Sequence, residues 1–263
     1  MNHMPELHFA DLPKIIEENN IIKSEVENLL RKYLQHYHPK GWTIIEGAKK
    51  YIAMQHFLIE APIQDQSLGG FIRSTDTEKY ICYVNTYQPR IYQNFSLLHE
   101  LYHLISLQEL EKKIHIVHAG LDTNHTERKA DYFASLLLMD EHELINFYNS
   151  FEKNEETTLQ KIFLCMSRFK APFKAILIRL YELQLIDYAT IKEYFDQKFD
   201  YHKEFEALGI DSYMIERSNV IHFGKIEMMM QKYTLPEAAQ QANKQVLEEI
   251  TRYFHTMKGD AVD

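Results

Sequence analysis

The sequence predicts an α+β fold, in which a short sheet lies among helices and a mostly helical region follows. Three observations support this class. Apolar residues recur at helical spacing before residue 55 and again after residue 94, and short apolar runs suited to strands lie between these positions. After residue 157 helical patterns predominate. We therefore expect a sheet-containing domain at residues 1–150 and a helical region at residues 151–263.

Two helices and three strands are predicted in the first part of the chain. Residues Ser24–Tyr37 carry apolar side chains at i, i+3 and i+4 spacing, which is typical of an amphipathic helix. Residues Thr43–Gln55 predict a second helix. Three short apolar runs follow and predict strands at Phe57–Ile59, Gly70–Ile72 and Tyr80–Asn85.

A third helix, predicted over Asn94–Ile105, carries His99, Glu100 and His103 in the order H-E-x-x-H. Residues four apart lie on one face of a helix, so both imidazoles can bind one metal ion. Glu100 can then reach a water on that metal and act as general base, as in zinc hydrolases. The alternative is an ordinary amphipathic helix with these polar residues in solvent. The broad apolar stripe favours burial, and buried polar groups need a partner such as a metal.

A second helix can supply the third ligand, since catalytic zinc usually has three protein ligands and one position for water. A continuation that places a glycine and a third histidine after the motif is absent, because Ser106 and Glu109 occupy those positions. The helix predicted over Thr126–Met139 offers Glu127 instead. Asp131 lies on the same face and would accept the free N–H of a ligating histidine.

Other side chains between the two helices compete for the metal: His115, His118, Asp122 and His125. We expect most of them to be loop residues in solvent. One of the three histidines is a candidate donor that steadies the anionic transition state. For Glu127 itself, the alternative is a solvated carboxylate favoured by the helix dipole.

Two sequence blocks resemble the ImmA/IrrE metallopeptidases. Residues 95–104 read F-S-L-L-H-E-L-Y-H-L and are similar to the family signature F-[ST]-x-x-H-E-L-x-H-L. Residues 127–139 read E-R-K-A-D-Y-F-A-S-L-L-L-M and are similar to E-x-x-A-[ND]-x-F-A-x-x-L-L-M-P. Tyr102 stands where glycine is usual and Asp140 where proline is usual, but neither is a proposed ligand. The resemblance covers about residues 40–190.

The resemblance implies a small zincin-like core and a zinc-dependent endopeptidase. It implies one Zn²⁺ per chain, bound by His99, His103 and Glu127, with Glu100 as the base. It also implies a protein substrate, a cytoplasmic helix-turn-helix repressor or another regulatory protein, in stress responses or mobile-element induction. Metal-dependent hydrolysis of a non-peptide amide is an alternative that the ligands alone leave open.

A rival function comes from residues 159–185, which follow a polar stretch and predict two helices joined by a turn containing proline, like a helix-turn-helix. Five basic residues and no acidic one lie between Leu159 and Tyr181: Lys161, Arg168, Lys170, Lys174 and Arg179. The rival is a non-catalytic regulator that binds DNA or a partner protein, with a structural metal. We favour a packed helical lid, because a net charge of −9 gives little attraction for nucleic acid.

The composition predicts a soluble cytoplasmic protein. Hydrophobic residues make up 45% and charged residues 25% of the chain, which is ordinary for a globular domain. The N-terminus lacks the layout of a signal peptide, and no apolar run is long enough to cross a membrane. Cys82 and Cys165 lack redox spacing, so we expect reduced thiols. The tail from residue 201 carries no chemical motif and ends in a helix predicted over Leu235–Met257.

Overall fold

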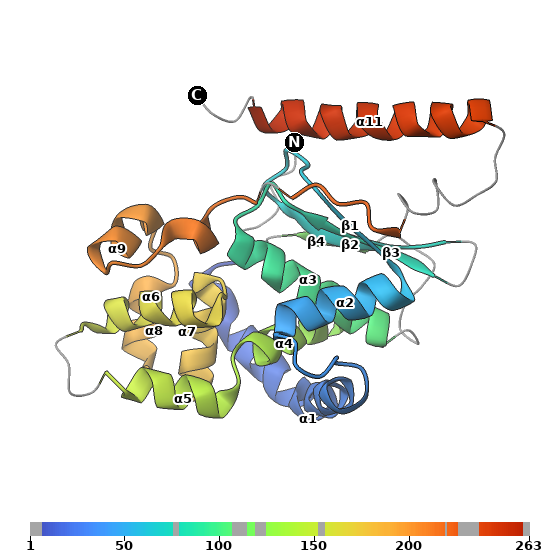
Figure 1. Ribbon diagram of the computed structural model, residues 1–263. Helices are drawn as coiled ribbons and strands as arrows, with labels where there is room; N and C mark the ends of the chain where they lie inside the picture. The colour runs from blue at the N-terminus through green and yellow to red at the C-terminus, as the bar shows by residue number, and fades with distance from the viewer. Residues whose placement is uncertain are drawn as a thin grey trace.

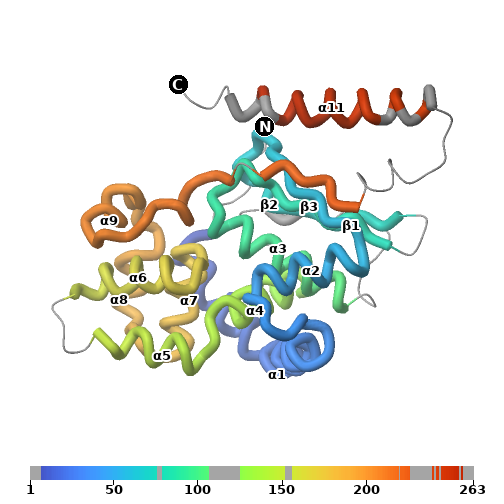
Figure 2. Tube along the Cα trace, in the orientation of Figure 1, coloured from blue at the N-terminus to red at the C-terminus, as the bar shows by residue number. Residues whose placement is uncertain are grey.

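The computed structural model describes residues 7–75, 79–106, 115–118, 125–151, 156–218, 220–225 and 237–259. Helices and strands form two groups that lie side by side, one with the sheet and one purely helical (Figures 1 and 2). The first part of the chain contains η1 (Phe9–Asp11), α1 (Leu12–His36), α2 (Ile44–Gln55), β1 (Phe57–Ala61), β2 (Leu68–Ser74), β3 (Tyr80–Asn85), α3 (Arg90–Ile105), β4 (His115–His118) and α4 (His125–Leu138). The second contains α5 (Glu141–Asn149), α6 (Thr158–Phe169), α7 (Phe173–Glu182), α8 (Tyr188–Tyr194), α9 (Tyr201–Ala207), η3 (Ser212–Ile215) and α11 (Glu237–Gly259).

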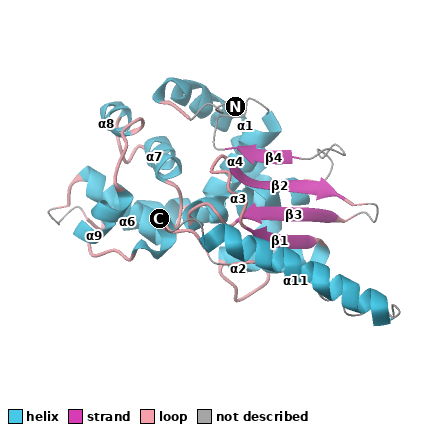
Figure 3. Cartoon of the chain, turned by 90° about the horizontal axis from the view of Figure 1, so that it is seen from above, coloured by secondary structure: helices cyan, strands magenta, loops and turns pink. Residues whose placement is uncertain are grey.

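The four described strands form one mixed sheet in the order β1-β3-β2-β4 (Figure 3). Strands β1 and β3 are parallel, whereas β2 is antiparallel to both β3 and β4. Helix α3 packs against β2 and β3, and α2 packs against β1. The α3 helix is therefore held between the sheet on one side and α4 on the other.

Two apolar cores stabilise the chain. The sheet-side core combines α2, α3, α4, the sheet and the later part of α1, with Ile72, Leu98, Leu101, Tyr102 and Phe133 among its buried residues. The helical core combines α5–α9 with the start of α1, with Leu12, Ile15, Phe163, Phe173, Leu177 and Phe195 among its buried residues. Helix α1 is long enough to contribute to both. Its Asn19 donates from Nδ2 to Glu182 on α7 at 2.7 Å, which ties the cores together.

The structure confirms the α+β class and most predicted elements, and it corrects several boundaries. Helix α1 begins at Leu12 rather than Ser24, because Leu12 and Ile15 extend its buried stripe into the helical core. Helix α3 begins at Arg90, so Asn94 lies inside the helix. The expected loop at residues 115–118 is wrong, because these residues form β4 on the edge of the sheet. Helices α5, α8 and α9 were not predicted, because each has fewer than ten residues.

The two helices predicted within residues 159–185 are present as α6 and α7. Lys170 joins them in the left-handed conformation, with φ of 53°. Both helices bury their apolar faces in the helical core. The division of the chain at residue 150 stays a prediction. Cys82 and Cys165 are buried free thiols, as expected. Within the described residues, no helix has the length and apolarity that a membrane crossing requires.

Candidate metal centre

The centre of α3 is an almost fully buried segment that contains charged and polar side chains. His99, Glu100 and His103 are at most 2% exposed, while Leu98, Leu101 and Leu104 around them are fully buried. The apolar side chains explain why the helix is held inside, between the sheet and α4. They do not compensate the polar groups that they carry into the core, so those groups need partners of their own.

Helix α4 brings a carboxylate to the two histidines. Glu127, in its first turn, is buried with its carboxylate 2.9 Å from His99 Nε2 and 3.2 Å from His103 Nε2. The two Nε2 atoms are themselves 3.2 Å apart. These separations are close to the spacing of roughly 3.3 Å between ligands of a tetrahedral zinc ion with bonds near 2.0 Å. Three donor atoms therefore converge as they would around one metal.

Asp131 lies one turn further along α4 and contacts the other side of His99. Its Oδ1 is 2.9 Å from His99 Nδ1, and its Oδ2 is 3.5 Å from Arg128 Nη1. When Nδ1 carries the proton and donates it to Asp131, the lone pair of Nε2 faces the other two donors. This is the arrangement that orients histidine ligands in metal sites. Asp131 therefore lies within hydrogen-bonding distance of His99 Nδ1, and its role in a metal site stays a prediction.

The charges of this cluster depend strongly on one another. Burial by itself lowers the pKa of His99, but hydrogen bonds to Asp131 and Glu127 and their negative charges outweigh it and raise the pKa to about 10. Burial raises the pKa of Glu127, but hydrogen bonds from His103 and His99 hold it well below its usual range. The pKa of Asp131 is lowered too, since the charge of Arg128 and the His99 hydrogen bond overcome its burial. The pocket therefore favours a cation beside two ionised carboxylates.

Glu100 points toward the sheet and lacks such partners. It is fully buried, and among the described residues neither carboxylate oxygen has a hydrogen-bond partner. Burial, with a smaller contribution from the charge of Glu127, raises its pKa to about 8, although the charge of His99 opposes the shift. A buried carboxylate without a partner is costly, and such groups concentrate at functional sites.

Gly70 on β2 provides the space for Glu100. A side-chain carbon at this position would lie 2.6 Å from the Tyr83 carbonyl oxygen and 3.5 Å from the Glu100 carboxylate. The first distance is too short, so any larger residue would push β2 away from its neighbour or from α3. Glycine at this position therefore keeps the strand close to the buried carboxylate.

The structure brings together some of the predicted site residues and not others. His99, His103 and Glu127 form the one group among the described residues whose donor atoms could share a metal ion. His125 is exposed at the first residue of α4. The backbone of His115 and His118 lies in β4, but their side chains, like Asp122, lie outside the described residues. The roles assigned to these residues stay predictions.

Sequence reasoning missed two contributors. Arg128 and Lys129 are buried beside Glu127, and Lys129 donates to Glu25 on α1 at 2.8 Å. Arg128 reaches Asp131. The opposite charges of residues 128 and 131, three apart on one helix, were a usable sequence signal for the contact between Arg128 and Asp131. No local pattern could reveal Lys129, because its partner lies on a distant helix.

Comparison with known families identifies the domain that contains this site. The model of the Peptidase M78 family, described as the IrrE N-terminal-like domain, matches residues 55–181. Residues 55–181 are an IrrE N-terminal-like domain. The match includes α3 and α4 and therefore all the residues of the cluster. It supports a metallopeptidase of the IrrE/ImmA family, a family that is typically metal-dependent. No curated protein matches the chain.

The side chains of this IrrE-like domain fit a metal ion. Two imidazole nitrogens and a carboxylate oxygen are the ligands that zinc takes in hydrolases. Asp131 orients one of them, and Glu100 has both oxygens available for a polar partner. The arrangement can hold a cation at three donors and place a general base beside it.

Proposed function

We propose that this protein is a zinc-dependent endopeptidase of the ImmA/IrrE type, with a zincin-like catalytic core. The observation that carries the proposal is the convergence of His99 Nε2, His103 Nε2 and the Glu127 carboxylate within about 3 Å of one another, beside the buried Glu100. The family match to residues 55–181 supports the reaction class.

Each residue would have a separate part in the reaction. His99, His103 and Glu127 would hold one Zn²⁺, which when bound polarises a peptide carbonyl and makes water more acidic. Asp131 would fix the ring of His99 through Nδ1. Glu100 would accept the proton of the attacking water and pass it to the leaving amine. Its raised pKa is consistent with a group that can both take and release a proton.

The proposed substrate is a cytoplasmic helix-turn-helix repressor or another regulatory protein. This part of the proposal is supported by the family resemblance. The test is incubation with a small helix-turn-helix protein encoded beside this gene, followed by mass mapping of fragments. Zinc-loaded protein should cut at a defined bond, and the Glu100→Gln variant should not. Equal cleavage by both proteins would contradict the role of Glu100.

The rival proposal is a regulator that binds DNA or a partner through residues 159–185. Arg179 is buried and pairs with Glu182 at 3.1 Å, so it adds no charge to the surface, whereas Arg168 and Lys170 are exposed. A gel-shift assay on the unmodified protein and on a variant with Arg168 and Lys170 changed to Gln distinguishes the two functions. The peptidase proposal predicts no shift with either, and the rival predicts a shift that the double variant loses.

A further inference from the structure

The one tryptophan of the chain, Trp42, lies in the loop that joins α1 to α2, on the side of the molecule away from α11 (Figure 1). It is 45% exposed. Leu34, in the last turns of α1, is 41% exposed, and Tyr37, at the end of that helix, is 37% exposed. Single exposed apolar residues are ordinary, but a group that includes tryptophan and tyrosine is typical of a binding surface.

The loop holds Trp42 in a fixed place. With its proton on Nε2, His38 donates to the Trp42 carbonyl oxygen at 3.1 Å, and its Nδ1 accepts from the Tyr33 hydroxyl at 3.2 Å. Gly47 on α2 leaves room for the His38 ring, because a side-chain carbon there would lie 2.1 Å from it. Tyr33 is itself fully buried in the sheet-side core. The loop is therefore anchored to both helices, and an anchored side chain loses little freedom on binding.

The surface around Trp42 is basic, although the chain has a net charge of −9. Residues 31–56 contain five lysines and arginines and one acidic residue, Glu46. Of the five, Lys49 pairs with Glu60 at 2.6 Å. The other four are exposed and have no carboxylate partner among the described residues: Arg31, Lys32, Lys40 and Lys50. Their positive charge therefore remains available to another molecule.

Two of these cations lie over the exposed rings. Lys50 Nζ is 4.3 Å from the centre of the Trp42 ring, and Lys32 Nζ is 6.0 Å from that of Tyr37. The Tyr37 ring also contacts Tyr51, the neighbour of Lys50 on α2, at 5.7 Å. The rings and cations thus form one surface, the basic patch, made of residues 32–42 and Lys50. An aromatic ring attracts a cation without neutralising it, so the patch stays positive.

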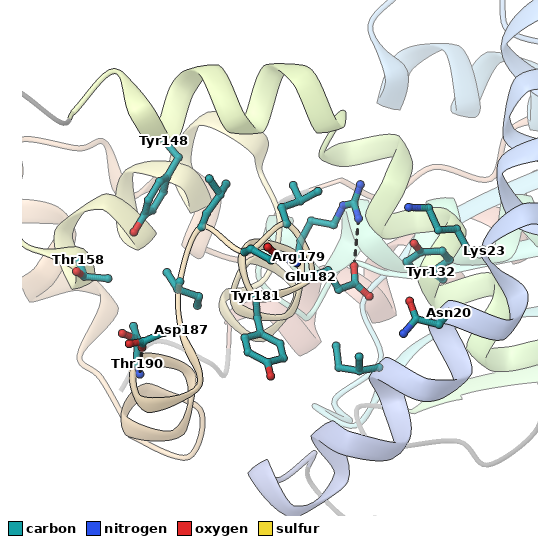
Figure 4. A pocket seen from close by; sticks show the side chains of 15 residues that line it. Asn20, Lys23, Tyr132, Tyr148, Thr158, Arg179, Tyr181, Glu182, Asp187 and Thr190 are labelled. Atoms are coloured by element: carbon teal, nitrogen blue, oxygen red, sulfur yellow. Dashed lines mark hydrogen bonds and ion pairs between the residues drawn. The ribbon is translucent and has the colours of Figure 1, made fainter.

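Several basic side chains elsewhere differ from the patch because they have carboxylate partners. Lys14 and Lys23 on α1 each pair with a glutamate one turn further along, at 3.8 Å. Arg179, on the wall of a cavity of about 810 Å³, pairs with Glu182 at 3.1 Å, the contact drawn in Figure 4. In the patch the positive charges have no such neighbours, so a negatively charged partner is electrostatically complementary to it.

We propose that the basic patch is a docking site for an acidic segment of a partner protein. Carboxylates of the segment contact Lys32, Lys40 and Lys50, and its apolar side chains pack on Tyr37 and Trp42. Charge complementarity aligns the segment, and the aromatic side chains anchor it. The proposal does not depend on the peptidase function, because no residue of the metal centre belongs to the patch.

A protein segment fits this surface better than a membrane or a nucleic acid does. Tyr37 and Trp42 are held against the protein and are only partly exposed, whereas insertion into lipid requires apolar side chains that reach roughly 5–10 Å into the bilayer. A nucleic acid carries a negative charge at every phosphate, so the net charge of −9 repels it more strongly than a short acidic segment.

The test uses a synthetic peptide of glutamate and leucine, in the order E-E-L-E-E-L-E-E. It has no aromatic residue, so the fluorescence of Trp42, the one tryptophan of the chain, reports contact at the patch itself. Titration of the full chain should give a saturable change in this fluorescence, and added salt should weaken the binding. A peptide with glutamine in place of every glutamate should bind at least about tenfold more weakly, because it cannot form ion pairs.

Charge variants test the location of the site. Lys32→Gln combined with Lys50→Gln should weaken binding of the acidic peptide by about fivefold or more, because two ion pairs are lost. Lys192→Gln combined with Lys203→Gln, at exposed lysines of α8 and α9, is the matched control and should bind as the unmodified protein does. Trp42→Ala, measured by calorimetry because it removes the fluorescence signal, should also bind more weakly.

Several results would overturn the proposal. The patch is not a docking site if the unmodified protein gives no saturable response, or if the patch double variant binds as tightly as the control. Equal binding of the neutral peptide would refute the role of charge, and unchanged affinity of Trp42→Ala would refute the aromatic anchor. Tighter binding of oligothymidylate or of phosphatidylglycerol vesicles than of the peptide would mean that the partner is not a protein. Circular dichroism of each variant confirms that it is folded.

Discussion

The two cores contain similar apolar side chains but differ in the polar groups that they enclose. Within and beside the sheet-side core, the described residues of α3 and α4 include six buried charged or histidine side chains: His99, Glu100, His103, Glu127, Arg128 and Lys129. Among the described residues of α5–α9, Arg179 is the one buried charged side chain. Buried charge is expensive, and proteins retain it mainly where it does chemistry. The proposed peptidase function therefore places the reaction beside the sheet-side core and predicts that the helical core contributes stability.

The largest expected effect is on the cleavage rate, and it comes from a substitution in the sheet-side core. Glu100→Gln keeps the size of the side chain and removes the base, so the cleavage rate should fall by about a hundredfold or more while bound zinc is unchanged. Cleavage assays with metal analysis of the same samples measure both. Glu193→Gln, at an exposed position on α8, is the control and should cleave normally. Loss of zinc from the Glu100 variant would show that this residue is a ligand rather than a base.

A substitution in the helical core should lower stability and leave metal binding unchanged. Phe163 is fully buried there and contacts Phe173 and Phe205. Phe163→Leu leaves a smaller cavity than alanine would, and we expect the free energy of unfolding to fall by about 1–3 kcal/mol. Denaturant unfolding measures this loss. The folded variant should still bind one zinc, because the three ligands lie in the other core. A variant that is stable but free of metal would contradict the separation of the two roles.

Weakening the contact between Asp131 and His99 Nδ1 should have a moderate effect on zinc affinity. Asp131→Asn keeps an acceptor in place but removes the negative charge that supports the imidazole. Zinc affinity should fall by about ten- to a hundredfold, as is typical when a carboxylate behind a histidine ligand is lost. Competition with a chromophoric chelator measures the affinity. Unchanged affinity would show that Asp131 serves folding alone.

The smallest expected effect lies at His56, outside both the metal cluster and the helical core. Burial and the charges of Lys225 and Lys79 lower its pKa to about 4, and its Nδ1 accepts from Tyr80 N–H at 3.4 Å. Because the unfolded chain binds a proton near pH 6.5 and the folded chain does not, His56 lowers stability progressively as the pH falls from about 6.5 to about 4. Above that window it has no such effect.

His56→Gln should therefore lose less stability than the unmodified protein between those pH values, by about 1–2 kcal/mol. Denaturant unfolding of both proteins at several pH values gives the difference, and the contributions of other groups cancel. If the free energy of unfolding depended on pH in the same way in both proteins, His56 would be protonated in the folded protein over this pH range.

The sequence predicted the site better than its surroundings. The H-E-x-x-H spacing and the position of Glu127 follow from helical periodicity, which sequence displays directly. The position of β4 could not be predicted, because an edge strand of four residues has too few alternations to distinguish it from a loop. The start of α1 was missed because its first turns are stabilised by α7 and its neighbours, far away in the chain. The contact of Lys129 with Glu25 depends on packing between distant helices, which no local pattern records.

In the proposed function, three side chains from two helices hold one zinc ion for catalysis. The most direct measurement is the metal content and affinity of the purified full chain, with Glu127→Ala and the exposed-site control Glu193→Ala beside it. We predict about one zinc per chain in the unmodified protein and the control, and a large loss of affinity in Glu127→Ala. Zinc content that is negligible in the unmodified protein, or equal in all three proteins, would contradict the account.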